Sequence, residues 1–177
     1  AAVSGVRASI NTGSTTNDGD GGTDTLIDVE NLIGSAFDDV LEGGSGSNDL
    51  SGGDGDDEFA GYSGNDVIDG GAGVNTVDYT DATSSVIIDL STQTASDDGY
   101  GFTDTLQNIQ NVTGSANDDS IAGNAFDNLL EGNDGDDTLT ASAGEDILDG
   151  AAGIDTVDYS TLVGVTGVQI ALNGAVD

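Results

Sequence analysis

Aspartate residues recur at a fixed spacing, and oxygen chemistry is the clearest signal in this sequence. Residues 34–78 and 114–158 each divide into consecutive nonapeptide units. Nearly every unit opens with glycine, and every unit places Asp or Asn sixth and one apolar residue eighth. Glycine allows backbone conformations in which carbonyl groups converge, and the sixth residue adds a polar or charged oxygen. Because Ca²⁺ prefers about six to eight oxygen ligands, this spacing predicts calcium-binding turns.

The charge balance points to the same kind of partner. The chain has 34 Asp and Glu residues against a single Lys or Arg, and its formal net charge is −33 over 177 residues. Such a chain can fold compactly only when external cations neutralise it. Nucleic acid is excluded as a partner because phosphate contacts need basic side chains, and membrane insertion is not expected because no stretch approaches about 18 apolar residues. The absence of cysteine and histidine removes disulfides, thiolate sites and most zinc chemistry.

Catalysis is not expected in this chain. Its many carboxylate pairs resemble those of glycosidases, but they lie in repeated turns, with no unique constellation and no histidine to tune them. Binding of a polysaccharide would need a groove of exposed aromatic residues, and only four Tyr and four Phe are present. We expect Tyr79 and Tyr159 to pack at the ends of the repeat blocks. The threonines form no regular array, which disfavours an ice-binding surface.

A longer repeat contains the short one. The chain aligns with itself when residue 23 is placed on residue 103, and the motif TDTL at 23–26 then matches the same motif at 103–106. We therefore divide the chain into a first unit at 1–79, a second unit at 80–159 and the truncated start of a third at 160–177. The third copy is cut short, which indicates a fragment of a longer protein with flanking domains.

The segments between the repeat blocks also predict β structure. Apolar residues alternate along 6–10 and 86–90, and the pattern returns at 168–172, which is typical of strands with one buried face. The segments 26–32 and 106–112 carry apolar residues three apart but are too short for a stable helix, so we predict irregular coil there. Helix content should be close to nil.

The nonapeptide unit itself predicts a solenoid. A six-residue turn and a three-residue strand make half of a flattened coil, so every second unit stacks on the one before it at about 4.8 Å. The eighth residues should point inward and form a thin core: Leu41, Leu50, Phe59, Ile68, Val77, Ile121, Leu130, Leu139, Leu148 and Val157. One apolar residue per unit buries too little surface to offset the ordering of the whole unit. We therefore expect an all-β solenoid whose folding depends on bound metal.

The unit GGDGDDEFA at 52–60 resembles the calcium-binding nonapeptide of the RTX, or hemolysin-type, family. That family forms a parallel β-roll, and the resemblance covers about half of the chain. It implies that each Ca²⁺ lies between turns two repeats apart. The ion would take carbonyls two and four with the sixth residue of one turn, and carbonyls one and three with the sixth residue of the other.

Six sites follow from this resemblance. They would be formed by Ser35, Phe37 and Asp39 with Gly52, Asp54 and Asp57; Gly53, Gly55 and Asp57 with Gly70, Ala72 and Asn75; Gly44, Gly46 and Asn48 with Gly61, Ser63 and Asp66; Ser115, Asn117 and Asp119 with Gly132, Asp134 and Asp137; Asn133, Gly135 and Asp137 with Gly150, Ala152 and Asp155; and Asn124, Phe126 and Asn128 with Ala141, Ala143 and Asp146.

Departures from the family pattern indicate which of these sites should bind calcium more weakly. Asparagine removes one charge at three sixth positions, namely Asn48, Asn75 and Asn128. Phe126 and Ala141 replace glycine in the turns around Asn128 and Asp146, which makes that site the weakest of the six. Outside the blocks, Asp24 and Asp104 end the turn-like segments GDGGTD and GYGFTD and are candidates for a further ion. Asp56 and Asp136, in the fifth position, are expected to be plain surface charge.

Two functions remain open at this point. The resemblance implies a module that is extended inside the cell, leaves by type I secretion and folds on Ca²⁺ outside, at an extracellular or cell-surface location. The near-exact long period favours an alternative, in which the repeats are a calcium-stiffened extender or lattice element of an adhesin or surface-layer protein. Homotypic assembly would be expected only in the second case.

Overall fold

The computed structural model describes residues 2–162, and in this part of the chain it contains 17 strands and no helix. The predicted absence of helix is therefore confirmed for these residues. The strands are β1 (Arg7–Ser9), β2 (Ser14–Asn17), β3 (Asn31–Ile33), β4 (Val40–Gly44), β5 (Asp49–Asp54), β6 (Glu58–Tyr62), β7 (Val67–Ala72), β8 (Thr76–Asp78), β9 (Ile87–Asp89), β10 (Thr94–Asp97), β11 (Asp104–Gln107), β12 (Asn111–Thr113), β13 (Ser120–Ala122), β14 (Leu129–Glu131), β15 (Thr138–Thr140), β16 (Ile147–Asp149) and β17 (Thr156–Asp158). Residues 2–162 therefore contain no helix that could span a membrane.

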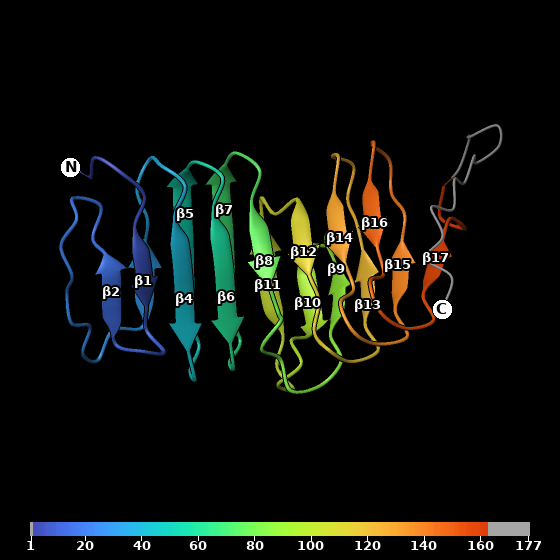
Figure 1. Cartoon of the computed structure of the whole chain (residues 1–177), viewed down its shortest axis with the longest axis horizontal. Helices are drawn as coiled ribbons and strands as arrows, with labels where there is room; N and C mark the ends of the chain where they lie inside the picture. Colours follow the sequence, from blue (N-terminus) through green and yellow to red (C-terminus); the bar gives the residue numbers. More distant parts are fainter. Residues whose placement is uncertain (1, 163–177) are drawn as a thin grey trace.

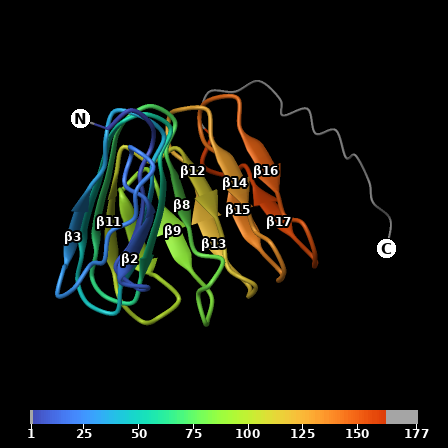
Figure 2. The same cartoon turned by 60° about the vertical axis from the view of Figure 1, so that its left-hand side comes forward.

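The strands form two sheets that run the length of the molecule (Figure 1). One sheet has the order β16-β14-β12-β8-β6-β4-β1-β2, and the other has the order β17-β15-β13-β9-β10-β11-β7-β5-β3. Within each block, successive strands alternate between the sheets, and strands two units apart pair in parallel, as Leu50 pairs with Ile68. Figure 2 shows the turns that join the two layers along both edges. This is the predicted all-β parallel roll.

The core between the sheets consists of the eighth residues of the units, as predicted, except at its last rung. Phe59, Ile68 and Leu139 are fully buried. Leu148 is only partly buried, and Val157 is 40% exposed, so its assignment to the core was wrong. Val157 lies on β17, which pairs only with β15, and no further described rung covers it.

The segment between the blocks is more regular than the sequence indicated. The strands predicted at 6–10 and 86–90 exist as β1 and β9, and each folds back on an antiparallel partner, β2 or β10, that was not predicted. The irregular coil predicted at 106–112 was only partly right. There β11 and β12 flank Asn108, whose positive φ of 54° reverses the chain between them. In the first unit, β3 is the counterpart of β12.

The two units occupy the sheets in opposite ways. The strands β4, β6 and β8 belong to the eight-stranded sheet, whereas their counterparts in the second unit, β13, β15 and β17, belong to the nine-stranded sheet. Sheet pairing is nevertheless continuous, because β8 pairs with β12 and β7 pairs with β11. The second unit therefore continues the roll of the first with its two faces exchanged. The predicted strand at 168–172 lies outside the described residues, as does most of the predicted third copy.

Candidate metal-binding turns

Most side chains at the sixth position lie inside the stack of turns, although Asp155 in the last described turn is exposed. In every turn after the first of its stack, Oδ1 of the sixth residue accepts a hydrogen bond from the backbone N–H of the sixth residue one turn earlier. For example, the N–H of Asp39 donates to Asp57 Oδ1 at 2.8 Å, and the N–H of Asn48 donates to Asp66 Oδ1 at 2.8 Å. Because this bond needs close stacking, the carboxylates are held away from water; Asp57 is 2% exposed.

The structure brings together all six pairs of turns that the sequence predicted. The bonds between sixth residues are Asp39 to Asp57 (2.8 Å), Asp57 to Asn75 (3.0 Å), Asn48 to Asp66 (2.8 Å), Asp119 to Asp137 (2.8 Å), Asp137 to Asp155 (3.1 Å) and Asn128 to Asp146 (3.1 Å). The backbones touch as well. A methyl group added to Gly53 would overlap the carbonyl oxygen of Ser35, and one added to Gly71 would overlap that of Gly53. Glycine at these positions allows the close approach, which places carbonyl oxygens between the turns.

The turns fall into two classes. At the start of each stack, the sixth side chain also closes its own turn; the N–H of Ser115 donates to Asp119 Oδ2 at 2.6 Å, and the N–H of Ser35 donates to Asp39 Oδ2. In most of the following turns the second residue has a positive φ, which is 115° at Gly53 and 72° at Asn133, and its N–H makes no such bond. The turn at 141–146 is an exception, because the N–H of Ser142 donates to Asp146 Oδ2 at 3.1 Å.

Three sixth-position carboxylates in the second class keep an oxygen without a partner. Asp57 Oδ2, Asp66 Oδ2 and Asp137 Oδ2 are buried and accept no hydrogen bond from the described residues. Leaving a charged oxygen buried and unpaired is strongly unfavourable. A hard cation at these oxygens would remove that penalty, so the residues fit calcium.

The asparagine turns behave differently. Asn128 Oδ1 accepts hydrogen bonds from the N–H of Asn124 at 2.8 Å and from the hydroxyl of Ser142 at 3.1 Å, while its Nδ2 donates to the carbonyl of Gln110. Asn48 is satisfied in a similar way, since its Nδ2 donates to the carbonyl of Glu30 at 2.7 Å. These amides complete their bonds within the protein, in keeping with the lower ranking of their sites.

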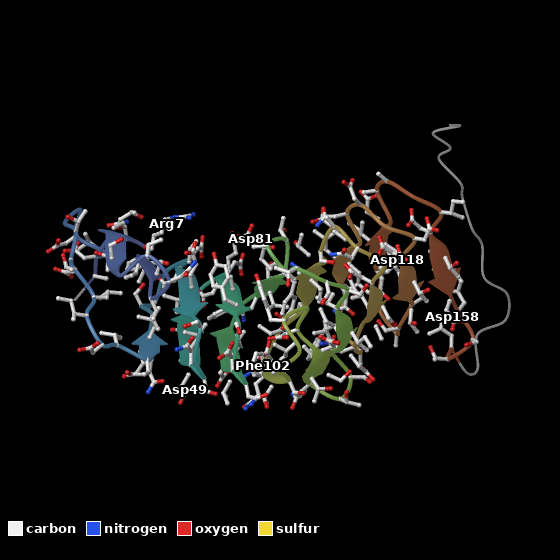
Figure 3. The ribbon with its side chains drawn as sticks, turned by 90° about the horizontal axis from the view of Figure 1, so that it is seen from below. Arg7, Asp49, Asp81, Phe102, Asp118 and Asp158 are labelled. Atoms are coloured by element: carbon white, nitrogen blue, oxygen red, sulfur yellow. The ribbon has the colours of Figure 1, made fainter. Side chains whose placement is uncertain are left out.

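Carboxylates alone do not form these sites. Among residues 2–162, no three acidic side chains gather closely enough to hold a metal ion by themselves. The ligand set must therefore include backbone carbonyls, as the sequence pattern implied. Figure 3 shows acidic side chains along the whole roll and Arg7, the single basic residue, near its N-terminal end.

Burial changes the protonation of the same carboxyl groups. Burial is the main cause that raises the pKa values of Asp57, Asp119 and Asp137. Burial, with the negative charge of Asp98 as a further cause, raises the pKa of Asp66 to about 6. Burial also raises the pKa of Asp104 to about 7. A bound cation would favour the ionised forms, because it supplies the opposite charge that the chain lacks.

Sequence reasoning missed one role of the fifth residue. Asp56 and Asp136 are exposed, but they are not plain surface charge. Asp56 Oδ1 accepts the N–H of Val74 at 2.7 Å, and Asp136 Oδ1 accepts the N–H of Ile154 at 2.8 Å. These bonds join one turn to the next along the outside of the stack. The frequent Asp or Asn at the fifth position was the available signal.

The two candidate carboxylates outside the blocks differ in burial. Asp104 is buried, whereas Asp24 is exposed. Tyr79 is buried where β8 ends, as expected, and its hydroxyl donates to Asp104 Oδ2 at 2.9 Å.

A two-layered parallel roll with stacked acidic turns defines a calcium-binding β-roll. The RTX calcium-binding nonapeptide repeat matches this chain in four copies, at residues 27–59, 51–80, 113–140 and 122–157. These matches cover more than half of the chain, and it belongs to that family. A search of the curated proteins finds no match.

Proposed function

We propose that Ca²⁺ fills the stacked turns and drives the folding of this roll outside the cell, as one module of a larger secreted protein. The observation that carries the proposal is the set of unpartnered, buried oxygens on Asp57, Asp66 and Asp137. They belong to a chain with a net charge of −33 and one basic residue. Binding free energy at these turns becomes folding free energy, because the unfolded chain has no preformed site.

The ligands follow the six sets implied by the family pattern. Asp57 and Asp137 have the largest role, because each stands between two neighbouring turns and would contribute to two ions. Their Oδ1 atoms already orient the turn before them, so their Oδ2 atoms are directed into the stack. Mg²⁺ is a poorer occupant, since it keeps its water molecules and demands octahedral geometry.

Calcium dependence would also control where the chain folds. Inside a cell, where free Ca²⁺ is scarce, repulsion among the carboxylates keeps the chain extended and suited to type I export. Outside, calcium neutralises the turns and the roll forms. The RTX repeat is a structural element, so an enzymatic activity of the parent protein would reside in a flanking domain.

The continuity of the two sheets supports a second candidate function. Because β8 pairs with β12 and β7 pairs with β11, the two blocks share one uninterrupted roll. Such a roll suits a calcium-stiffened extender or lattice element of an adhesin or surface-layer protein. The sequences on either side distinguish the two: a catalytic domain favours the export module, and many further copies of the long repeat favour the extender.

Far-ultraviolet circular dichroism tests the calcium dependence directly. The chain is treated with EDTA and titrated with Ca²⁺, and a parallel titration uses Mg²⁺. We expect a cooperative coil-to-β transition with Ca²⁺ and none with Mg²⁺ over the same range. A full β spectrum in EDTA would show that the apolar core is sufficient and would overturn the proposal.

A further inference from the structure

A hidden repeat lies between the two blocks. The segment 99–107 reads GYGFTDTLQ, with glycine first, Asp104 sixth and the buried Leu106 eighth. It lies outside all four matches to the family repeat, which leave residues 81–112 uncovered. The segment therefore follows the nonapeptide pattern at a place where no calcium turn is assigned.

The hydrogen bonds of this segment are those of a stacked turn. The N–H of Asp66 donates to Asp104 Oδ1 at 3.0 Å, which repeats the bond between sixth residues. The N–H of Thr103 donates to Asn65 Oδ1 at 3.0 Å, so the fifth residues of the two turns are joined as well. The strand β11 continues the parallel pairing from β7. The turn at 99–104 thus takes the next place in the stack after the turn at 61–66, although a hairpin separates the two in the sequence.

Three carboxylates are buried at this junction. Asp66, Asp98 and Asp104 are at most 1% exposed, and the Oδ2 atoms of Asp66 and Asp98 have no hydrogen-bond partner among the described residues. Asp98 lies within the turn, because its Oδ1 accepts the N–H groups of Tyr100 at 2.8 Å and of Phe102 at 2.9 Å. Figure 3 places Phe102 in the middle of the roll.

The charges of these carboxylates act on one another. Burial is the main cause that raises the pKa of Asp66 and of Asp104; the negative charge of Asp98 adds to this effect at Asp66, and the charges of Asp66 and Asp98 add to it at Asp104. The single basic residue, Arg7, lies near the far end of the roll, so no basic side chain neutralises the group. The hydroxyl of Tyr79 satisfies only one oxygen of Asp104.

We propose that the junction binds a hard divalent cation of the calcium type between the turns at 61–66 and 98–104, held by Asp66 and Asp98. Asp104 positions the turn instead, since its oxygens accept the N–H of Asp66 and the hydroxyl of Tyr79. Backbone carbonyls and water complete the ligand set. The inference rests on the proposed function. It adds a site outside the nonapeptide blocks, and it gives that site a role: the ion joins the last turn of one stack to the spacer that leads into the next block, so the two blocks fold as one cooperative unit.

The first unit offers a natural control for this site. Its turn at 18–24 has the same form, since Asp18 Oδ1 accepts the N–H groups of Asp20 at 3.1 Å and of Gly22 at 2.8 Å. There, however, the hairpin strand β2 ends its sheet, Asp24 is exposed, and Asp18 has no buried oxygen without a partner. The similar sequence DGDGGTD at 18–24 therefore lacks the neighbouring turn that would complete a site.

Calcium titration calorimetry on the whole chain tests the junction through the variant Asp98→Asn, with Asp18→Asn as the matched control. We expect Asp98→Asn to bind one ion fewer and to split the calcium-induced folding transition in two, whereas Asp18→Asn keeps both the stoichiometry and the single transition. Unchanged stoichiometry in Asp98→Asn would overturn the junction site. A wild-type chain that does not bind calcium would instead refute the proposed function itself.

A second measurement serves if Asp98→Asn does not fold. Terbium is used in place of calcium in the otherwise unmodified chain, and its emission is excited through tyrosine. Tyr79→Phe should reduce this emission without changing the number of bound ions, because Tyr79 lies against Asp104. Emission equal to that of the unmodified chain would contradict an ion at the junction.

Discussion

The two repeat blocks follow the same nonapeptide pattern, yet their strands extend to different lengths. In the first block β4 to β7 contain five or six residues, whereas β13 to β16 contain three each. Pairing in the first block continues into the turns, where Gly53 pairs with Gly71. The second block has only an isolated bridge there, between Asp134 and Ala152. Three of these four longer strands lead into units that open with two glycines, whereas no unit of the second block opens in this way; β6 is the exception, since it continues through Tyr62.

The cores of the blocks differ for another reason. Val77 is fully buried, while Val157, at the same place in the second block, is 40% exposed. The first block lies between the β1–β2 hairpin and the spacer strands, and the described part of the second block has such a neighbour on one side only. In a solenoid each rung is buried by its neighbours, so an identical residue contributes differently according to its position in the stack.

The largest effect is expected on the free energy of unfolding, when core substitutions in the two blocks are compared. Phe59→Ala removes a fully buried ring from the first block and should reduce the free energy of unfolding by about 3–5 kcal/mol. Leu148→Ala acts on a partly buried side chain and should cost less than about 2 kcal/mol. Urea unfolding at saturating Ca²⁺ measures both. Equal losses would show that burial does not fall toward the end of the second block.

A smaller effect is expected when substitutions of two neighbouring acidic residues in one turn are compared. Asp57→Ala removes an oxygen shared by two sites and should raise the Ca²⁺ concentration at the folding midpoint by at least about tenfold. Asp56→Ala removes an exposed hydrogen bond and should change stability by about 0.5 kcal/mol or less. Calcium titration followed by circular dichroism distinguishes them. The pair Asp137→Ala and Asp136→Ala repeats the comparison in the second block, and similar midpoints within either pair would refute the ligand assignment.

The smallest effect concerns the second residue of the last turn in each block. Ala151 has a positive φ of 59°, a strained conformation for a residue with a side chain, and its counterpart in the first block is Gly71. Ala151→Gly should stabilise the second block by about 1 kcal/mol. Gly71→Ala should destabilise the first, because its methyl group would overlap the Gly53 carbonyl oxygen. Thermal unfolding of both variants in calcium checks the opposite signs.

Much of the fold could be predicted because one period controls both the turns and the core. The phase of the eighth residues located the inward face, and the sixth residues located the pairs of stacked turns. The hairpins at β1 and β9 could not be predicted in the same way. Their antiparallel partners are polar segments whose pairing depends on where the neighbouring rungs lie, and a local pattern does not contain that information.

The candidate sites show a similar limit. The positions of Asp57 and Asp137 in the repeat indicated their shared role, but the difference between Asp24 and Asp104 was not visible. Both belong to the same TDTL motif. Only the tertiary structure shows that the turn at 61–66 stacks on Asp104, whereas no described turn stacks on Asp24 in the same way. The importance of Asp98 depends on the same turn at 61–66.

The exchange of sheets between the two units has a geometric consequence. The step from the first long unit to the second advances the roll by an odd number of half-turns, so equivalent residues of the two units face in opposite directions, as in a twofold screw. The sequence repeats with every unit, but the structure would repeat only after two units. A partner that recognised one surface of a unit would meet that surface on alternating sides of a longer array.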